Sequence, residues 1–524
     1  MKLINKLLNP LFVLHLLFVG AVLLGYIPRE LVIYETIILT IYFLLCPPED
    51  GIIFFVRAIP LWIAIPITPS YDNLNQWRLF VLILFLRWLL TRESWHYIGS
   101  GLILISRKPW LFIKEHSWAI ILKLLLILAL ISLWHAGDVV VGLRKIIFFI
   151  NASLLGIVIA YPPRPKEFTN RLIKNITIPV IIVTLVGIAQ VVSTYFIDIY
   201  QFMRIWGEGI QLNEFGATWS YIAIHVGNTW FAYFGDQLSL RVFSLFPDSH
   251  SFPIFLLLGL PAFFAWTLIK PLEKSERFKS MLGTRGKLAV LWIPLIFLMM
   301  ILSGTRGIWA GGVAMIIWSL IVLGFMKYQS VKKENRNIFM YLASYLVIFF
   351  LLFSVAYPIF SSPQFLVSKG NSLLLKQRFK SIIDFGETSN GQRIEIWKKS
   401  LASIKDKPLI GVGIGNFPVV LDQKILLSKA GSSAHNVYLQ VATEMGLIAL
   451  VLFLLLLWLV LKHIYNSFTK ESSLAHKAYL GGLLITFPWV LAYLMTDVAI
   501  FDERALLLCV ATLAILASRA KSHV

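Results

Sequence analysis

The chain has 524 residues, of which 58% are hydrophobic and only 14% charged, and its net charge is +20. A soluble domain of this size has no interior large enough to hide so much apolar surface. The composition therefore excludes a soluble globular protein and predicts an all-α polytopic membrane protein. Its basic residues are scattered through loops, so we expect contact with anionic membrane lipids and no nucleic-acid partner.

Apolar runs of about 20 residues, long enough to cross a bilayer as a helix, recur along the chain. They lie at residues 11–27, 30–46, 51–69, 77–91, 117–134, 140–161, 176–197, 252–270, 288–303, 307–326, 338–360, 437–462, 478–499 and 504–519. The sequence predicts about 12 to 14 transmembrane helices. The first run follows basic residues, but no small-residue cleavage site comes after it, so we expect a helix and not a signal peptide.

The basic loops predict the orientation, because Lys and Arg are retained on the cytoplasmic side. The basic loops are at residues 107–114, 164–174, 270–287 and 327–336, and the loops between them are poor in Lys and Arg. We therefore expect a protein of the cytoplasmic membrane with both termini in the cytoplasm. Two long segments, 198–251 and 361–434, are then predicted to lie outside.

This topology divides the chain into five parts. They are N-terminal transmembrane helices (1–197), an aromatic-rich interfacial segment (198–251), central transmembrane helices (252–360), an extracytoplasmic loop domain (361–434) and C-terminal transmembrane helices (435–524). Within the loop domain, "GQRIEIWKKSLASI" predicts an amphipathic helix. Its apolar side is expected to carry Ile394, Trp397, Leu401 and Ile404.

"ILSGTRGIWAGG" places Arg306 at an outer turn between two spans. Gly307 and Gly311 have the spacing that lets helices pack closely in lipid. The guanidinium is either a snorkelling anchor or an anion ligand, and its place in a glycine-rich turn on the less basic side favours the ligand.

Arg393 and His435 fall on the same predicted side of the membrane as Arg306. Taken singly, Arg393 would lie on a solvated helix face. His435 would merely lie at the start of a helix that Asn436 caps. Taken together, two arginines can hold a diphosphate, and a histidine can take a proton from a hydroxyl. This combination predicts glycosyl transfer from a lipid-linked donor, which needs no nucleotide.

Other polar features have simpler interpretations. "GVGIGNF" (411–417) lacks a complete nucleotide-binding pattern and predicts a turn. Glu444 lies about 13 Å along the helix from His435, and we expect a partner for it inside the bundle. Asp497, Asp502 and Glu503 either bind sugar hydroxyls or are hydrated. No cysteine pair or acidic cluster has the spacing of a metal site.

Three stretches in this order resemble the O-antigen ligase and O-antigen polymerase superfamily of bacterial envelope glycosyltransferases. They are "SGTRG", "GQRIEIWKKSLASIKDKPLIGVGIGNF" and "AHNVYLQVATEMGLIAL". In the last, His435 and Asn436 are followed by nine residues and then Gly446, which is similar to the family's His-Asn motif. The resemblance covers roughly residues 288 to 460.

The resemblance implies a GT-C-like, metal-independent transferase without a cofactor. Arg306 and Arg393 would engage undecaprenyl pyrophosphate, with Trp397 nearby, and His435 would be the base on a glycan or lipid acceptor.

"RVFSLFPDSHSF" resembles the family's Arg-then-Pro-Asn stretch and implies a substrate-binding Arg241. Here Asp248 replaces the usual Asn and His250 is additional. With Arg241, the residues expected to bind substrate are Asp248, His250, Trp397 and Asn436. Ala449 replaces the Gly, Thr or Tyr of the ligase form of the motif, so ligation and polymerisation both remain open. If the protein polymerises, a chain-length regulator is a further expected partner.

The alternative from a different class is a transporter of an anion or small solute. Charged residues such as Arg87 and Glu444 would then line a path through the membrane. The sequence shows neither paired half-length spans nor an inverted repeat, which favours the enzyme.

Overall fold

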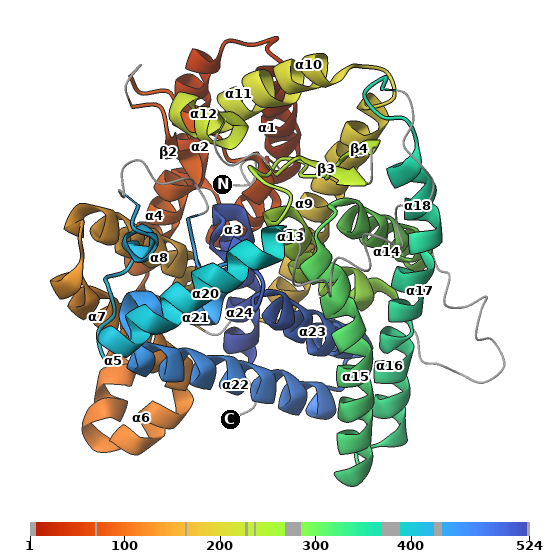
Figure 1. The fold of residues 1–524 in the computed structure, drawn as a ribbon. Helices are drawn as coiled ribbons and strands as arrows, with labels where there is room; N and C mark the ends of the chain where they lie inside the picture. Colours follow the sequence, from red (N-terminus) through yellow and green to blue (C-terminus); the bar gives the residue numbers. More distant parts are fainter. Residues whose placement is uncertain are drawn as a thin grey trace.

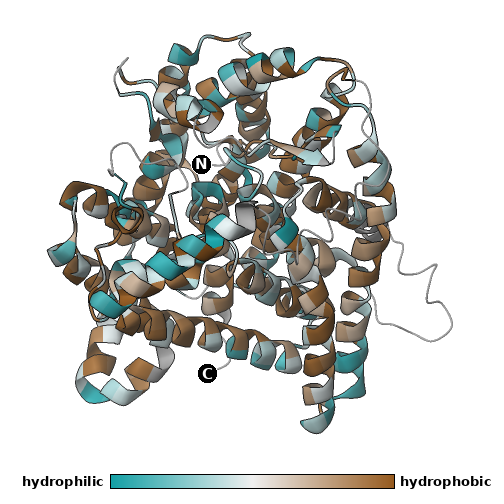
Figure 2. Cartoon of the chain, in the orientation of Figure 1, coloured by the Kyte–Doolittle hydropathy of each residue, from teal (hydrophilic) through white to brown (hydrophobic). Residues whose placement is uncertain are grey.

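The computed structural model describes residues 7–68, 71–162, 165–225, 229–234, 237–267, 284–367, 388–423 and 432–520. In this part of the chain helices dominate, and the strands form only two short antiparallel hairpins (Figure 1). The predicted all-α polytopic membrane fold is therefore confirmed. Figure 2 shows hydrophobic residues along most helices, as expected for surfaces that face lipid or the interior of the bundle.

Nine α-helices lie in the described residues of the N-terminal part. They are α1 (Leu8–Leu23), α2 (Val32–Leu45), α3 (Pro48–Arg57), α4 (Gln76–Leu89), α5 (Arg92–Arg107), α6 (Pro109–Glu115), α7 (Ser117–Ser132), α8 (Val139–Ala160) and α9 (Lys166–Ser193). Between α3 and α4, β1 (Ala64–Ile65) pairs with β2 (Leu74–Asn75).

The middle of the chain begins with short helices and a hairpin in place of a span. These elements are α10 (Ile199–Phe202), a π-helix (Met203–Gln211), α11 (Leu212–Phe215), α12 (Ala217–His225), β3 (Phe231–Phe234) and β4 (Gln237–Leu240). The central helices follow: α13 (Ser251–Thr267), α14 (Thr284–Leu302), α15 (Arg306–Tyr328), α16 (Lys333–Ala343), α17 (Tyr345–Leu351) and α18 (Phe353–Ser361).

The C-terminal part starts with the predicted amphipathic helix and ends with long apolar helices. They are α20 (Thr388–Asp406), α21 (Val437–Met445), α22 (Leu447–Lys470), α23 (Leu474–Tyr493) and α24 (Glu503–Ala520). In the described residues, seven helical stretches are long and apolar enough to cross a membrane: Ser117–His135, Val139–Ala160, Lys166–Ser193, Arg306–Tyr328, Lys333–Ser361, Leu447–Lys470 and Leu474–Tyr493. Other predicted spans correspond to shorter apolar helices such as α1 and α13, so the total of 12 to 14 stays a prediction.

Helices α13 and α23 form the centre of the bundle. Nearly every described residue of both helices is buried, and they pack against each other. Gly482 makes the close approach possible, because a Cβ there would lie 2.6 Å from Phe264 and 3.1 Å from the backbone of Pro261. Small residues at such crossings gain van der Waals contact that larger side chains would prevent.

Helix α15 also packs on α23, through the two glycines that the sequence singled out. A Cβ on Gly307 would lie 2.3 Å from the Thr496 hydroxyl, and one on Gly311 would lie 2.7 Å from the Trp489 ring. The predicted close-packing role of both glycines is confirmed. This contact fixes the first turn of α15, which carries Arg306, against the end of α23.

Three predicted boundaries are wrong. The predicted span 51–69 ends as a helix at Arg57, because Pro60 cannot continue it and the chain turns into β1. The predicted span 437–462 is two helices, since Gly446 interrupts it with a φ of 87°. The basic stretch 164–174 is not a loop from Lys166 onward but the start of α9. Most of the predicted loop 270–287 lies outside the described residues.

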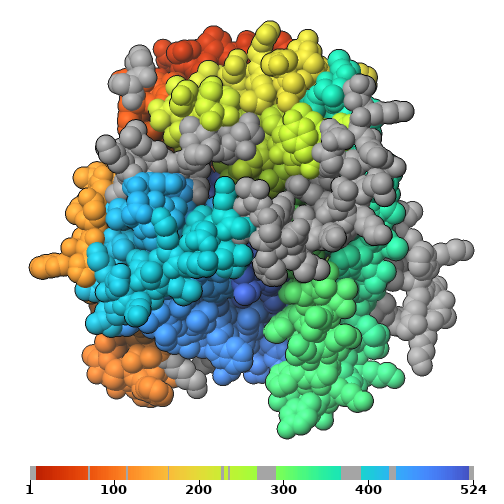
Figure 3. Space-filling model, in the orientation of Figure 1, coloured from red at the N-terminus to blue at the C-terminus, as the bar shows by residue number. Residues whose placement is uncertain are grey.

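The amphipathic helix is confirmed as α20, but one of its predicted apolar residues is not on the buried side. Ser400 is fully buried, whereas Leu401 is 58% exposed. Neighbouring helical residues point about 100° apart, so a buried face that contains Ser400 and Ile404 turns Leu401 outward. Figure 3 shows α20, in cyan, on the same face of the molecule as the green α15.

Candidate functional site

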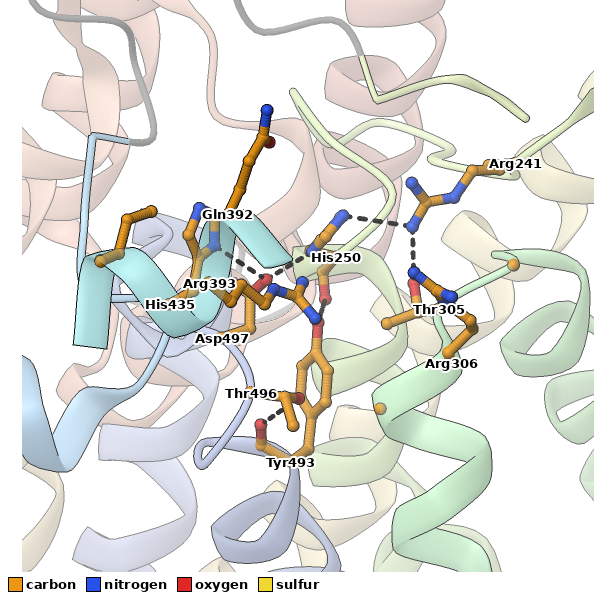
Figure 4. Close-up of a pocket in the computed structure, with 13 residues that line it drawn as sticks. Arg241, His250, Thr305, Arg306, Gln392, Arg393, His435, Tyr493, Thr496 and Asp497 are labelled. Atoms are coloured by element: carbon orange, nitrogen blue, oxygen red, sulfur yellow. Dashed lines mark hydrogen bonds and ion pairs between the residues drawn. The ribbon is translucent and has the colours of Figure 1, made fainter. Parts of the chain in front are cut away.

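A cavity of about 270 Å³ lies where the described ends of several helices meet (Figure 4). It is lined by Arg241, His250, Gly304, Thr305, Arg306, Gly307, Gln392, Arg393, Ile396, His435, Tyr493, Thr496 and Asp497. The structure thus brings Arg306, Arg393 and His435 into one site, although they are far apart in the sequence. Three guanidinium groups and one carboxylate give this cavity a cationic character.

Most polar lining residues lie where a helix or strand begins or ends, and the others lie on the helix that covers the cavity. Arg241 follows β4, His250 precedes α13, Arg306 begins α15, Arg393 and Gln392 lie on α20, His435 precedes α21, and Asp497 follows α23. Three helices therefore begin at the cavity. The partial positive charge of a helix N-terminus adds to that of the arginines.

The turn before α15 holds Arg306 and supports Arg241. Gly304 has a φ of 63°, and a Cβ at this position would lie 2.9 Å from the Arg241 side chain. A residue with a side chain would therefore be strained and would displace the arginine. Thr305 does not cap α15 with its side chain; its hydroxyl donates to the Ser249 carbonyl at 2.9 Å.

Arg241 is fixed by neighbours from three segments. Its Nε donates to the Ser303 carbonyl at 3.2 Å, and one terminal nitrogen lies 3.4 Å from the Thr305 hydroxyl. The same nitrogen lies 3.1 Å from Nε2 of His250. The backbone of Arg241 is anchored as well, since its N–H donates to the Trp230 carbonyl at 2.7 Å.

His250 bridges Arg241 and Asp497. Its Nδ1 lies 2.5 Å from Oδ2 of Asp497. The other carboxylate oxygen, Oδ1, accepts from the backbone N–H groups of Val498 and Ala499 at 2.8 and 3.0 Å. The Asp497 carboxylate is therefore held from both sides, with Oδ2 turned toward the cavity.

His435 faces the same oxygen. Its Nδ1 is buried, has no hydrogen-bond partner among the described residues and lies 3.9 Å from Oδ2 of Asp497. Burial opposes the charge on Asp497, but His250 and His435 outweigh it and hold the pKa of this carboxyl well below its ordinary value. The site thus contains a histidine whose inner nitrogen faces a carboxylate that its neighbours stabilise in the ionised form.

The backbone at His435 and the helix after it determine where the imidazole points. His435 has a φ of 45°, in the left-handed region that non-glycine residues seldom adopt. Asn436 then caps α21, as predicted, by accepting from the Leu439 N–H at 3.0 Å. The sharp turn followed by a capped helix directs His435 into the cavity.

Helix α20 covers the cavity and is tied to the histidine turn. Arg393 is half-buried on the side of α20 that faces the site. One helical turn later, Nε1 of Trp397 donates to the Ala434 carbonyl at 2.9 Å. Arg393 and His435 are therefore positioned relative to each other by a direct hydrogen bond between their supports.

Not all predicted substrate-binding residues line the cavity. Asp248 accepts from the backbone N–H groups of His250 and Ser251 and so begins α13. Asn436 serves as a helix cap, and Trp397 holds the Ala434 carbonyl. These three residues support the site from outside its wall, whereas the predicted Arg241 and His250 reach it.

Sequence reasoning did not assign Asp497 to this site, although it noted an acidic group near the outer ends of the last two helices. Tyr493, Thr496 and Gln392 were not considered at all. The signal available for Asp497 was a carboxylate inside the last turn of the predicted span 478–499, where a charged side chain is costly unless it has a partner. Its pairing with His250 joins residues 247 positions apart, and no local pattern predicts such a contact.

The remaining sequence features have structural roles. Glu444 accepts from Gln440 at 2.6 Å, so the expected partner exists. Residues 411–416 form the predicted turn, with positive φ at Gly411, Gly413 and Gly415.

Arg87 does not share a cavity with Glu444. It donates to the Phe43 carbonyl at 2.6 Å and lines a separate, much smaller cavity with no contribution from Glu444. Within the described residues, no three His, Cys, Asp or Glu side chains are grouped to hold a metal.

Fold and site together define a multi-pass helical membrane protein with a cationic cavity that contains an imidazole and a carboxylate. Residues 289–454 match the family model described as O-antigen ligase. The match confirms the predicted resemblance to the O-antigen ligase/polymerase superfamily and supports a membrane glycosyltransferase of ligase or polymerase type. At a general level, the family implies lipid-linked glycan donors and acceptors. None of the curated proteins compared matches the chain.

The matched region contains Arg306, Arg393 and His435. Arg241, His250 and Asp497 lie outside it, yet they line the same cavity. The cavity is thus assembled from the matched region and from segments on both sides of it.

Proposed function

We propose that this protein transfers a glycan from undecaprenyl pyrophosphate to an acceptor hydroxyl at the outer face of the cytoplasmic membrane. The observation that carries the proposal is the single cavity that Arg306, Arg393 and His435 share. Arg306 and Arg393 hold the pyrophosphate, and His435 is the base. No metal or cofactor takes part in the proposed reaction.

The cationic wall suits a diphosphate. Arginine stays charged and offers paired donors to phosphate oxygens, so two arginines bind a diphosphate more specifically than lysines would. Arg306 occupies the first turn of α15, where the hydroxyl of Thr305 is engaged elsewhere and does not cap the helix. A phosphate beside this helix start is stabilised by the helix dipole.

The base faces the correct way for proton transfer. Since Nδ1 of His435 faces Asp497, Nε2 is the nitrogen available to the acceptor. In the proposed step the acceptor oxygen attacks the anomeric carbon of the donor sugar. The bond from that carbon to the diphosphate oxygen breaks, and its electron pair leaves with the undecaprenyl diphosphate. The hydroxyl proton moves to Nε2 of His435, and Asp497 stabilises the imidazolium that forms.

The sidedness is supported by the length of α15. Its 23 residues span about 34 Å at 1.5 Å per residue, close to the thickness of the hydrocarbon core. Arg306 is at one end, and the basic turn that contains Lys327, Lys332 and Lys333 is at the other. The positive-inside rule assigns that turn to the cytoplasm and therefore Arg306 to the outer face.

The proposal is tested by replacing His435 with Ala in cells that depend on this protein for polymer. We expect loss of the mature, transferred glycan, accumulation of glycan on the lipid carrier and an unchanged protein level. The matched control is His225→Ala, because His225 is an exposed histidine outside the cavity, and it should retain normal polymer. Wild-type transfer of the glycan from the lipid carrier to its acceptor in the His435→Ala variant would overturn the proposal and favour transport.

The same cells distinguish polymerisation from ligation. A polymerase makes chains that are graded in repeat number, so its loss leaves single repeat units on the lipid carrier. Loss of a ligase instead leaves full-length polymer on that carrier. A chain-length regulator is expected as a partner only in the first case.

A further inference from the structure

We propose that His250 is a positioning residue, held in one tautomer by Arg241, that aims Asp497 at Nδ1 of the base His435. The inference rests on the proposed function, in which His435 accepts the proton. It assigns a role in the reaction to a histidine outside the region matched by the family. It also connects the arginine side of the cavity with its proton-accepting side.

The first step is the tautomer of His250. A guanidinium carries only N–H donors and does not lose its proton in a protein. The Arg241 nitrogen at 3.1 Å therefore requires an unprotonated Nε2 on His250. The proton of the neutral ring then lies on Nδ1, which donates it to Oδ2 of Asp497 at 2.5 Å.

The second step is the sharing of Oδ2. Both imidazoles face this oxygen, His250 at 2.5 Å and His435 at 3.9 Å. Backbone N–H groups already occupy Oδ1, so the Nδ1–H of His250 fixes the position of Oδ2. By donating to Oδ2, it also weakens the electrostatic attraction between this oxygen and His435. Catalytic hydrogen bonds are often long in a site without substrate and shorten when the reaction begins.

The charged and titratable neighbours of His250 come from every element packed around it. Arg241 lies on one side of the ring and Asp497 on the other. Asp248 accepts from the His250 backbone N–H. The Tyr493 hydroxyl donates to the His250 carbonyl at 3.5 Å. Arg306, Arg393 and His435 complete the cavity. A proton added to Nε2 would face the Arg241 guanidinium, a donor and a like charge, so this environment keeps Nε2 as an acceptor.

The test uses two amides that each replace one ring nitrogen. In His250→Asn the amide N–H₂ occupies the place of Nδ1 and can still donate to Asp497. In His250→Gln the amide reaches the place of Nε2, so it can accept from Arg241 but leaves Asp497 without its donor. Asp497→Asn removes the carboxylate itself. Neither histidine variant changes the charge of a neutral ring.

The rate of glycan transfer is measured from pH 5 to 9 with the full-length protein in lipid nanodiscs. The substrate is a membrane extract from cells that lack the protein, which contains both accumulated donor and acceptor. In wild type the rate falls on the acidic side as the base becomes protonated. We expect His250→Gln to lose about tenfold in rate and to move this acidic limb upward by about 0.5–1 pH unit, because Asp497 then holds the imidazolium more strongly.

The other variants give opposite or null shifts. Asp497→Asn should move the acidic limb downward by about 1 pH unit or more, since an opposite charge is lost beside the base. His250→Asn should keep the wild-type limb and a larger share of the rate than His250→Gln. Thermal unfolding of each variant in the same nanodiscs shows whether it is folded.

Two results would overturn the inference. If His250→Asn and His250→Gln lost the same fraction of the transfer rate and the acidic limb did not shift, His250 would have only a packing role. If both variants kept the wild-type rate and the wild-type acidic limb, His250 would have no role in the reaction. An active His435→Ala variant would instead remove the proposed function itself, so the two failures are distinguishable.

Discussion

Two residues of the site have left-handed backbone conformations, Gly304 with a φ of 63° and His435 with a φ of 45°. For a residue with a Cβ such a conformation costs about 1–2 kcal/mol. Glycine avoids the cost at position 304, whereas His435 carries it immediately before the capped helix α21. The surrounding contacts, among them the Trp397 hydrogen bond to Ala434, must hold the histidine turn in place.

Gly304 allows a direct test at this scale. Replacing Gly304 with Ala adds a Cβ 2.9 Å from Cγ of Arg241 and imposes an unfavourable φ. We expect the unfolding free energy to fall by about 1–3 kcal/mol and the transfer rate to fall at least about tenfold, because Arg241 is displaced.

Gly324 is the control. It lies within α15, the helix that follows the Gly304 turn, and a Cβ there meets nothing within 4 Å. Gly324→Ala should leave the rate unchanged and stabilise the helix by about 0.5–1 kcal/mol. Thermal unfolding in detergent and the transfer assay measure both effects. Equal behaviour of the two variants would contradict the proposed importance of the Gly304 turn.

The residues of the site differ in how far the sequence could predict them. Arg306, Arg393 and His435 were predicted because each interrupts an apolar or amphipathic pattern at an interpretable place. The link from Asp497 to His250 was not, because its two residues come from loops far apart in the chain. A hydrogen bond between distant loops depends on helix packing, which composition and periodicity do not specify.

Among the secondary-structure elements, α20 connects the cover of the cavity to the base. Its helical pattern was readable from the sequence, but the rotation about its axis was not, as the exposed Leu401 shows. A buried serine, Ser400, replaces the expected leucine because its hydroxyl bonds to the Ile396 carbonyl at 2.8 Å within the helix. Hydrophobicity alone therefore predicted the element and misjudged its face by one residue.

The contact between α20 and the histidine turn is tested with Trp397→Phe. This change keeps most of the aromatic packing but removes the N–H that donates to the Ala434 carbonyl. A lost hydrogen bond costs about 0.5–1.5 kcal/mol, so we expect a rate that is about two- to tenfold lower with little change in thermal stability.

Lys398→Ala on the exposed side of α20 is the control for this variant. Lys398 pairs with Glu395, and both side chains are about two-thirds exposed. Exposed pairs of this kind contribute little, so the rate should remain at the wild-type level. A Trp397→Phe protein as active as this control would show that the hydrogen bond does not position His435.

The break at Gly446 is the other element that the sequence misjudged. A Cβ at this residue would lie 2.1 Å from the Leu409 carbonyl oxygen, so only glycine fits between the two helices. The apolar run was continuous across this point and predicted one span. The distinguishing information is the packing of a distant loop, which an apolar pattern does not contain.

For the molecule as a whole, one buried ion pair joins three regions of the chain. Arg504 on α24 lies 2.6 Å from Glu214, and both side chains are almost fully buried. The same guanidinium donates to the Leu245 carbonyl at 2.6 Å and approaches the Trp62 carbonyl at 3.4 Å. The N-terminal part, the segment between α9 and α13, and the last helix thus meet at a single side chain.

Breaking this pair is expected to be costly, whereas removing both partners is not. Arg504→Met leaves a buried carboxylate without its partner and should lower the unfolding free energy by about 3–5 kcal/mol. Arg504→Met combined with Glu214→Met should recover most of that loss, because neither charge remains. Unfolding curves of the two single variants and the double variant give the coupling energy directly.

The exposed Lys398 to Glu395 pair again supplies the comparison. Lys398→Met should change the unfolding free energy by less than about 0.5 kcal/mol. If Arg504→Met were equally mild, the pair would not hold the three regions together.

The size of the cavity has a consequence for the product. A cavity of about 270 Å³ has room for the reacting ends of two substrates and not for a long saccharide. If the proposed reaction occurs there, short and long chains present the same terminus to Arg306, Arg393 and His435. The chemistry is then blind to the length already made, and any measuring of length takes place beyond these walls.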